Sequence, residues 1–406
     1  MIGIVGGGSA GLWAACFLKK RGADFILLER NSECGKKLLL TGHGRCNITN
    51  LKDPASLKTG YHEASNYIYP TLKKFTPQDA VNFIEGELNI KLKEEDNNRI
   101  FPVSDSAKTI RDGLVNYIGK ENILTDYYVT DIKKDDKFIL TSKDGRVTEV
   151  DTLIIATGGK SFAKTGSDGQ GITLAKNLGH DITALYPALV PVVVKEKEFT
   201  SSVAGVAVNA GADLYIDHKK KNGSVGDVLF THNGLSGPVI MNLAREIPED
   251  VERRFGWIEL DFTPGRNESE VEAELLESIK NRPEAKVTTL GSSFVPKSVA
   301  GAIGRHVGIE DVRGSDLKKE DRRKFVQDIK HMKFTIEGQS KYSEAYVTRG
   351  GVSLKNIKRE SFESKIVPNL YLIGEMIDVD GISGGYNLQA TMSEAYVAVN
   401  DIMLKS

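Results

Sequence analysis

The first thirty residues alternate between continuous apolar runs and a stretch with helical spacing. Residues 2–5 form a short β-branched run and residues 24–29 a second apolar run, which is typical of strands buried on both faces. Between them, apolar side chains recur on one side of a helix (Leu12, Cys16 and Phe17), and Gly22 stands where that helix would end. The pattern predicts a strand–helix–strand unit that begins a parallel sheet.

Two further apolar runs, far along the chain, end in glycines in the same way. The run 153–156 leads into the bend 157–159, and the run 369–373 leads into the glycine-rich segment 374–385. Because three distant parts of the chain each lead a strand into a glycine-rich bend, we expect one nucleotide-binding domain built from both ends of the chain. A helix is predicted after the last bend, with four apolar residues on one face: Leu388, Met392, Ala395 and Val399.

The middle of the chain has a different pattern. Two prolines in 186–194 mark the exit from the first domain, and short apolar runs from 192 to about 262 are typical of strands. Residues 268–281 and 316–329 show the period of amphipathic helices. The predicted division is a nucleotide-binding domain (1–190 and 341–406), an inserted β-rich domain (191–262 and 331–340) and a helical domain (263–330).

Turn and cap residues predict three local features of the inserted segments. Asn222-Gly223, in the charged stretch 217–227, is typical of a hairpin turn. Ser236 is expected to cap a helix that begins near Pro238, and Ser315 is expected to cap a later charged helix.

Composition narrows the class of protein. The chain has 406 residues, enough for two or three packed domains, and its 54 Lys and Arg side chains balance 55 Asp and Glu. A nucleic-acid partner or an anionic membrane usually requires a basic face, so neither is expected. The first residues lead us to expect no signal peptide, and no apolar run approaches the ~18 residues of a transmembrane helix, so a cytoplasmic protein is predicted. Neither a disulfide framework nor a metal site is expected, because the three cysteines form no C-x-x-C motif.

The glycines of the first bend match the G-x-G-x-x-G spacing of dinucleotide-binding folds. Gly6 allows the tight turn, Gly8 lets the backbone approach a pyrophosphate, and Gly11 lets helix and strand pack closely. Glu29 ends the second strand, 18 residues after Gly11, where its carboxylate suits an adenosine ribose. In this context we predict dinucleotide binding, with an ordinary βαβ unit as the alternative.

FAD fits the three bends better than NAD. The first bend accounts for the ADP half, and Glu375 or Asp378 could accept hydrogen bonds from ribityl hydroxyls. The helix that opens near Tyr386 could aim its N-terminus at the flavin N1/O2 edge, where reduction places negative charge. The alternative for Gly384-Gly385 is a simple turn before a helix. We therefore expect FAD that is bound non-covalently.

Five motifs, spaced along the whole chain, carry a resemblance to a known family. They are "GGGSAGLWAA", "CGKKLLLTGHGRCNITN", "ATGGKSFAKTGSDGQG", "LFTHNGLSGPVI" and "GEMIDVDGISGGYNLQ". Together they resemble the bacterial NAD(P)/FAD-dependent oxidoreductases of the aminoacetone-oxidase and bile-acid-pathway reductase type. The resemblance implies an α/β fold: a glutathione-reductase-like FAD-binding Rossmann domain with an inserted β-barrel-like domain and a small helical domain.

The resemblance also implies which residues hold FAD. The ADP half falls to Gly6, Gly8, Gly11 and Glu29. The pyrophosphate and isoalloxazine side falls to Lys36, Lys37, Thr41, Gly42, Gly44, Arg45, Cys46 and Asn47. The ribityl chain and the flavin ring fall to Glu375, Asp378, Gly384, Gly385, Tyr386, Asn387 and Leu388. Further FAD contacts are expected at Ser9, Ala10, Arg30, Val129, Ala156, Thr157, Gly158 and Gly374.

Three features of the chain depart from the family pattern. His43 stands where a glycine is frequent, and Arg349 replaces the alanine of a TAGG-like stretch. The last helix carries Ala390 and Ala395 where a tryptophan and a later glycine are common. We expect FAD binding to survive these changes, whereas the substrate side is where the chain would differ from its family.

The expected function is that of an FAD-dependent oxidoreductase acting on a small molecule. In one version NAD(P)H, as a transient donor, reduces the flavin, which then reduces an activated C=C or C=O bond. In the other, the flavin oxidises a small amine or amino acid and O2 reoxidises it to give peroxide. The oxidase stays open because the chain shows no separate NAD(P)H fingerprint beyond a weak candidate at 166–171.

Side-chain chemistry leaves the catalytic groups open. His43 and His232 are acid/base candidates, but a histidine in such a loop more often holds the loop together, so no catalytic residue is assigned. An RNA-modifying flavoprotein and a non-catalytic FAD sensor are the rival classes.

Overall fold

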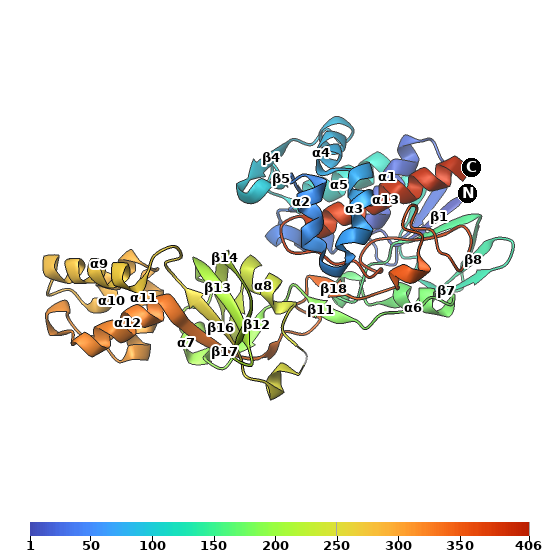
Figure 1. Cartoon of the computed structure of the whole chain (residues 1–406). Coiled ribbons are helices and arrows are strands. Elements are labelled where there is room, and N and C mark those ends of the chain that lie inside the picture. Colours follow the sequence, from blue (N-terminus) through green and yellow to red (C-terminus); the bar gives the residue numbers. More distant parts are fainter. Residues whose placement is uncertain (249, 406) are drawn as a thin grey trace. The chain divides into compact units, whose positions relative to one another are not determined.

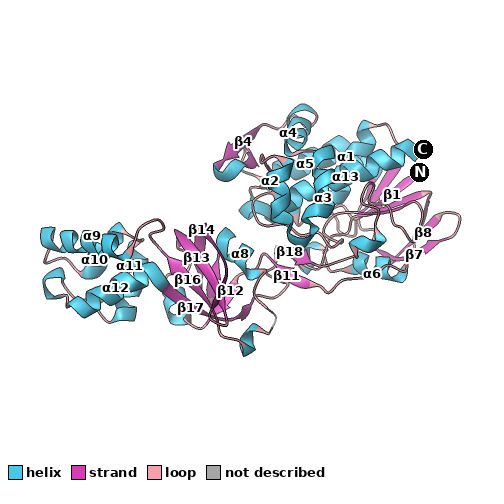
Figure 2. Cartoon of the chain, viewed as in Figure 1, coloured by secondary structure: helices cyan, strands magenta, loops and turns pink. Residues whose placement is uncertain are grey.

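The computed structural model describes residues 1–248 and 250–405. Its internal contacts divide the chain into two compact units. The first unit joins both ends of the chain, Met1–Pro187 and Ala345–Ser406, and the second is Ala188–Glu344. The second unit holds both a barrel and a group of helices, which Figure 2 colours separately. The finer division into three domains stays a prediction.

A parallel sheet of five strands forms the centre of the first unit. Its strands are β1 (Ile2–Val5), β2 (Phe25–Leu28), β6 (Ile123–Leu124), β10 (Thr152–Ile155) and β19 (Leu370–Leu372). They lie in the order β19-β10-β1-β2-β6, and Ile4 pairs with both Ile154 and Leu27. Because parallel strands share one carboxyl edge, the three strands that lead into glycine bends are neighbours at that edge.

Helices from both ends of the chain pack together on this sheet. α1 (Ser9–Lys20) and α13 (Tyr386–Lys405) lie side by side in Figure 1. The helices between them in sequence are α2 (Pro54–Leu57), α3 (Ser65–Lys74), α4 (Pro77–Gly86), α5 (Ala107–Ile118) and α6 (Gln170–Asn177). α1 also contacts α5, and α13 contacts α3 and α4. An aromatic cluster centred on Phe17 joins α1 to its neighbours through Trp13, Phe75, Phe83 and Tyr396.

Two small three-stranded antiparallel sheets also belong to the first unit. One is the meander β7 (Val129–Lys134), β8 (Phe138–Ser142) and β9 (Val147–Val150). It packs closely on the central sheet, since a Cβ added to Gly3 would lie 2.9 Å from Val150. The other has the order β3-β5-β4, with bounds Thr49–Asn50, Arg99–Pro102 and Leu92–Glu95. β11 (Tyr186–Ala188) pairs with β18 (Val347–Arg349).

The second unit is a closed six-stranded barrel with helices. The barrel order is β12-β15-β14-β13-β16-β17, which confirms the predicted β-barrel-like insertion. The bounds are Val192–Val194 (β12), Ala207–Ile216 (β13), Lys219–Thr231 (β14), Gly234–Ser236 (β15), Gly256–Asp261 (β16) and Met332–Gln339 (β17). The helices are α7 (Lys197–Ser202), α8 (Pro238–Ala244), α9 (Glu268–Asn281), α10 (Val287–Leu290), α11 (Lys297–Val307) and α12 (Lys319–His331).

The hairpin between β13 and β14 turns at a different place from the one predicted. Its turn is Asp217-His218, where both residues have positive φ (50° and 63°). Asn222-Gly223 instead lies inside β14, beside a register shift that follows the pair Leu214 and Asn222. A Cβ on Gly223 would lie 1.9 Å from an Asp213 carboxylate oxygen, so the glycine serves a close approach across the pair rather than a turn.

Two predicted helix caps are also wrong. Ser236 is the last residue of β15, and Gly237 occupies the N-cap of α8. Ser315 lies in a short 3-10 turn, and α12 begins only after Lys318. Ser236 lies one residue before the N-cap of α8 and Ser315 three residues before the N-cap of α12, and no side-chain hydrogen bond caps either helix.

None of the helices among the described residues is long and apolar enough to cross a membrane.

Candidate functional site

The three glycine bends meet at the carboxyl edge of the central sheet. Gly6, Gly158 and Gly374 follow β1, β10 and β19, and their φ values are 105°, 78° and 79°. A Cβ on Gly6 would lie 2.6 Å from the carbonyl oxygen of Ala156, and a Cβ on Gly374 would lie 2.7 Å from Ala10. The bends therefore pack against each other, which only glycine permits at these positions.

The fingerprint loop has the shape that a diphosphate requires. A Cβ on Gly11 would lie 1.8 Å from the carbonyl oxygen of Gly6, so the first turn of α1 sits directly on the loop. A Cβ on Gly8, by contrast, would meet no protein atom within 4 Å. Open space beside Gly8, at the N-terminus of a twelve-residue helix, offers N–H groups and a positive dipole to an anion. The residues present thus fit the diphosphate of FAD.

Glu29 holds the fingerprint loop from the end of β2. Its carboxylate is buried and accepts a hydrogen bond from the Gly7 N–H at 2.7 Å. It also accepts two from Asn31, one from the backbone and one from the side chain, both at 2.7 Å. Burial raises the pKa of Glu29, although these hydrogen bonds lower it in part.

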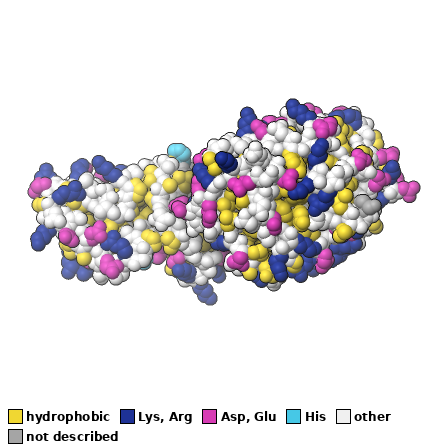
Figure 3. Space-filling model, turned by 90° about the horizontal axis from the view of Figure 1, so that it is seen from above, with side chains coloured by type: hydrophobic (Ala, Val, Ile, Leu, Met, Phe, Trp, Pro, Cys, Tyr) yellow, Lys and Arg dark blue, Asp and Glu magenta, His cyan; other side chains and the backbone are white. Residues whose placement is uncertain are grey.

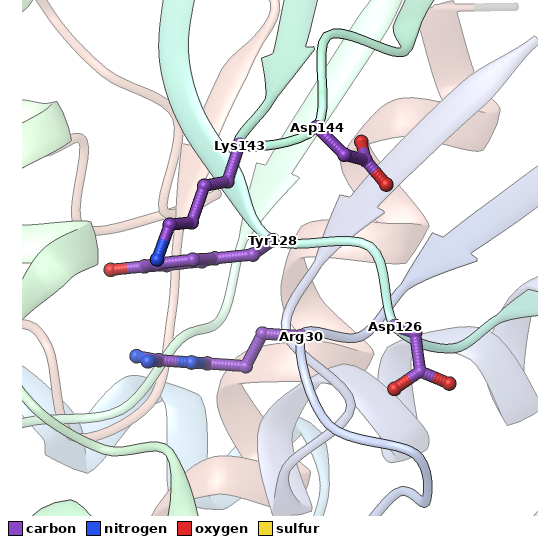
Figure 4. Close-up of a pocket in the computed structure, with 5 residues that line it drawn as sticks. All are labelled: Arg30, Asp126, Tyr128, Lys143 and Asp144. Atoms are coloured by element: carbon purple, nitrogen blue, oxygen red, sulfur yellow. The ribbon is translucent and has the colours of Figure 1, made fainter.

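A pocket lined by charged side chains and one aromatic ring lies beside Glu29. The Arg30 guanidinium lies 4.0 Å from the centre of the Tyr128 ring and pairs with Asp168 at 2.6 Å. Figure 4 shows it roughly parallel to the ring, with the Lys143 side chain approaching the ring from the other side. The pocket measures about 420 Å³ and is lined by Arg30, Asp126, Tyr128, Lys143 and Asp144. Stacked planar groups of this kind suit a nucleobase.

Val129 follows Tyr128 at the start of β7 and is buried. The backbone N–H of Tyr127 donates to the Glu29 carbonyl at 2.9 Å, which joins this segment to the end of β2. The structure therefore brings Arg30 and Val129, two residues assigned from the resemblance, to the same corner as Glu29.

A polar network links the second and third bends. The Lys37 ammonium donates to Glu375 at 2.5 Å and to the Ser161 hydroxyl at 2.7 Å. Ser161 in turn donates to Glu375 at 2.6 Å, and the Thr348 N–H donates to the same carboxylate at 2.9 Å. A Cβ on Gly159 would lie 2.4 Å from the Thr348 hydroxyl, so this glycine is needed for the network to close. Ser161 and Thr348 were not predicted, because nothing local marks them.

We expect Lys37→Met to lower the free energy of unfolding by about 1–3 kcal/mol, because it leaves the Glu375 carboxylate partly buried without its cation. The two side chains are 22% and 18% exposed. The matched control is Lys19→Met, whose pair with Glu121 is 42% and 66% exposed and is expected to change stability by less than about 0.5 kcal/mol. Urea unfolding of both variants checks this, and equal losses would contradict the structural role of Lys37.

The loop of residues 38–47 is irregular and tightly held. Its backbone has positive φ at Gly42, His43, Gly44 and Cys46. The Arg45 guanidinium donates to Glu95 and Asp105 and lies 4.3 Å from the centre of the Phe101 ring. Its fork of donors is therefore occupied by protein carboxylates, and a contact from Arg45 to FAD stays a prediction.

The thiol of Cys46 is fully buried, and burial raises its pKa to about 12. Cys16 and Cys34 are buried as well, so none of the three carries an accessible thiolate.

The segment 374–388 closes on the N-terminal loop. The Asn387 side chain accepts from the Gly381 N–H and donates to its carbonyl, both at 2.8 Å. With its amide oriented to satisfy its neighbours, Asn47 accepts from the Gly385 N–H at 3.2 Å. A Cβ on Gly385 would lie 2.5 Å from the Thr49 backbone. Loop 38–47 and the start of α13 thus form one wall of the candidate site.

Two further assigned residues, Asp378 and Tyr386, belong to the segment 374–388. Asp378 is half-buried, and burial raises its pKa while a hydrogen bond from Thr183 lowers it. Tyr386 is buried, and its carbonyl accepts from the Tyr61 hydroxyl at 2.7 Å. His43 is exposed in the first unit, and His232 is exposed in the second. Neither histidine is placed by a described contact to act as an acid or base.

Comparison with known proteins agrees with this geometry. The family model described as "HI0933-like protein Rossmann domain" matches residues 1–401. A 3-dehydro-bile acid delta(4,6)-reductase of Clostridium scindens is 30% identical over 406 residues, covering 98% of this chain and 97% of the relative. A ribosomal RNA dihydrouridine synthase of Escherichia coli is 27% identical over 408 residues, with the same coverage. One of Haemophilus influenzae is 28% identical over 410 residues and also covers 98% and 97%.

Among solved structures, a 3-ketosteroid delta1-dehydrogenase of Sterolibacterium denitrificans aligns with a TM-score of 0.53 at 11% identity, covering 100% of this chain and 99% of that one. At that identity the likeness speaks for the fold alone. The five sequence motifs, the glycine edge and the full-length match agree, and the resemblance seen in the sequence is confirmed. The chain belongs to the HI0933-like family of Rossmann-domain proteins and is an FAD-dependent oxidoreductase.

Proposed function

We propose that this chain is a cytoplasmic reductase that uses FAD, with NAD(P)H as electron donor, to saturate a C=C bond conjugated to a carbonyl group in a small organic substrate. The observation that carries the proposal is the 30% identity over nearly the full length of both chains to a delta(4,6)-reductase of a 3-dehydro-bile acid. A 3-oxo group conjugated to such a bond makes its far carbon electrophilic, which is what a hydride donor needs.

The described residues divide the binding of FAD among them. Bound FAD supplies hydride transfer, and the chain supplies position and charge. The N-terminus of α1 at Gly8 would hold the diphosphate, and Glu29 would meet the ribose. Arg30 and Tyr128 would hold the nucleobase. The segment around Glu375, which the ion pair with Lys37 holds in place, would bind the ribityl chain.

The wall formed by loop 38–47 and the start of α13 would shape the flavin environment. The backbone N–H groups at the start of α13 point out of a twenty-residue helix, so they favour negative charge next to them. This electrostatic help requires no acid or base from the chain, and the proton that completes the saturation of the C=C bond would come from solvent.

The experiment is anaerobic mixing of FAD-loaded protein with NADPH and, in parallel, NADH. We expect bleaching of the visible flavin band, followed by reoxidation on addition of a steroid 4-en-3-one and not of its saturated analogue. A flavin that stays oxidised with both nucleotides, but is reduced by a small amine and then releases peroxide once O2 is admitted, would establish the oxidase instead. Protein that cannot be loaded with FAD would overturn the proposal.

A second candidate substrate is RNA, and a specific observation favours it. Two relatives, 27% and 28% identical over 98% of this chain, are named ribosomal RNA dihydrouridine synthases. The uracil C5=C6 bond is itself conjugated to a carbonyl, so the chemistry would be the same. Against it, charges of both signs are interspersed on the face shown in Figure 3, whereas RNA-binding surfaces are usually basic.

The two substrates can be separated in one assay. Ribosomal RNA and the steroid enone are each incubated with the protein and NADPH, and dihydrouridine is measured by mass spectrometry of the digested RNA. Saturated steroid without dihydrouridine supports the first candidate. Dihydrouridine without steroid turnover would replace it with the second.

A further inference from the structure

A buried carboxylic acid lies directly beneath the third glycine bend. Glu394 is in α13 and is 1% exposed. Its Oε2 accepts a hydrogen bond from the Gly374 N–H at 2.6 Å. Gly374 begins the segment that carries Glu375, so Glu394 holds the end of β19 at the point where the chain enters the candidate cofactor site.

The same face of α13 also reaches the fingerprint helix. Thr391, one turn before Glu394, forms a hydrogen bond of 2.8 Å with the Ser9 hydroxyl in the first turn of α1. Gly374 packs on Ala10, the next residue of that turn. Glu394 thus lies behind the place where α1, α13 and the third bend come together, which is where the diphosphate is assigned.

Among the residues that the structure describes, no positive charge faces this carboxyl group from the elements packed against it. The titratable groups that face it are Tyr61, from the 3-10 segment Lys58–Ala64, and Tyr67 of α3. The Tyr67 hydroxyl is buried and has no hydrogen-bond partner among the described residues. Arg359 and Glu360 lie close enough to Tyr67 to influence its ionisation.

Burial without a cation favours the neutral acid. It raises the pKa of Glu394 to about 8, although the Gly374 hydrogen bond lowers it in part. At neutral pH the carboxyl group therefore keeps its proton. An ionised Glu394 would place a negative charge in a poorly screened interior. That charge would lie behind the junction of α1, α13 and the third bend, where the dianionic diphosphate is assigned.

We propose that Glu394 is a proton-linked positioning residue for the cofactor: FAD binds tightly to the protein with a neutral Glu394 and weakly once that carboxyl group ionises. The inference rests on FAD binding but not on the identity of the substrate. By linkage, FAD binding holds the proton in place, so binding at slightly alkaline pH takes up a proton from solution.

The test is the Kd of FAD from about pH 6.5 to about pH 9.5, followed by quenching of flavin fluorescence, for wild type, Glu394→Gln and the exposed control Glu360→Gln. We expect the wild-type and control Kd to rise by about fivefold or more, and that of Glu394→Gln to change by less than about twofold. Equal slopes in wild type and Glu394→Gln would overturn the inference.

A second measurement keeps the test decisive if Glu394→Gln does not fold. Titration calorimetry of wild type near pH 8, in buffers of different ionisation enthalpy, counts protons taken up with FAD. Uptake of a fraction of a proton supports the linkage, and zero uptake overturns it. Wild type that binds FAD with a flat pH profile would overturn this inference alone, whereas wild type that binds no FAD at any pH would overturn the cofactor assignment with it.

Discussion

Gly8→Ala is expected to weaken FAD binding by at least about 100-fold, equivalent to about 2.8 kcal/mol, while leaving the cofactor-free protein folded. The backbone of Gly8 has φ −78° and ψ −168°, which alanine adopts without strain. Its Cβ would meet no protein atom within 4 Å, so the apoprotein has no reason to change. The methyl group would instead occupy the space through which the diphosphate approaches the N-terminus of α1.

Two other glycines give this prediction its controls. Gly11→Ala would place a Cβ 1.8 Å from the Gly6 carbonyl oxygen, so it should destabilise the apoprotein as well as abolish FAD binding. Gly86→Ala adds a Cβ in open space at the end of α4 and should leave both properties unchanged. Flavin fluorescence titration and thermal unfolding of the apoproteins separate the three cases. Normal FAD affinity in Gly8→Ala would show that the diphosphate does not lie at the fingerprint loop.

The elements that depend on local pattern were predictable from sequence. The apolar run 2–5 and the helix after it became β1 and α1, and Gly22 ends that helix with φ 67°. The helix predicted for 268–281 is present with the same bounds, because Asn267 and Glu270 form a capping box at its start. In each case the signal lies within a few residues of the element it determines.

The features that failed depend on partners elsewhere in the chain. Asn222-Gly223 is a good turn sequence, but the pairing of β13 with β14 places the turn five residues earlier, at Asp217-His218. The long antiparallel pairing outweighs the local turn preference, and the extra residue is absorbed as a bulge. Local sequence patterns likewise could not predict the closure of the barrel or the order of its strands.

The candidate site also has some features that were predictable from the sequence and others that were not. The glycines of the three bends were predictable, because tight turns and close approach leave a mark on the residue itself. Their side-chain partners were not: Lys37 and Glu375 are 338 positions apart, and Arg45 meets Glu95 across 50. In the sequence, Glu394 is one polar position of an apolar helix, and only the packing of α13 shows that its side chain faces inward.

Glu394→Gln is expected to remove a large pH dependence from the stability of the cofactor-free protein. In the folded state the pKa of Glu394 is raised from 4.5 to about 8, whereas in the unfolded chain the group ionises near its usual value. The folded state therefore binds the extra proton between these two pKa values. The stability that this proton contributes is fully present below about pH 4.5 and is lost as pH rises toward about 8, at about 1.4 kcal/mol per pH unit.

A glutamine side chain has no proton to lose, so the variant should lack this slope. Urea unfolding at about pH 5, 6, 7 and 8 measures it, with Glu360→Gln as an exposed control that should keep the wild-type slope. If wild type and Glu394→Gln lose stability in parallel, the acid is ionised in the folded protein and is stabilised by a partner other than Gly374. If the slopes differ as expected, Glu394 is neutral in the folded protein at neutral pH. Its ionised carboxylate would then be the charge that opposes a diphosphate at the N-terminus of α1.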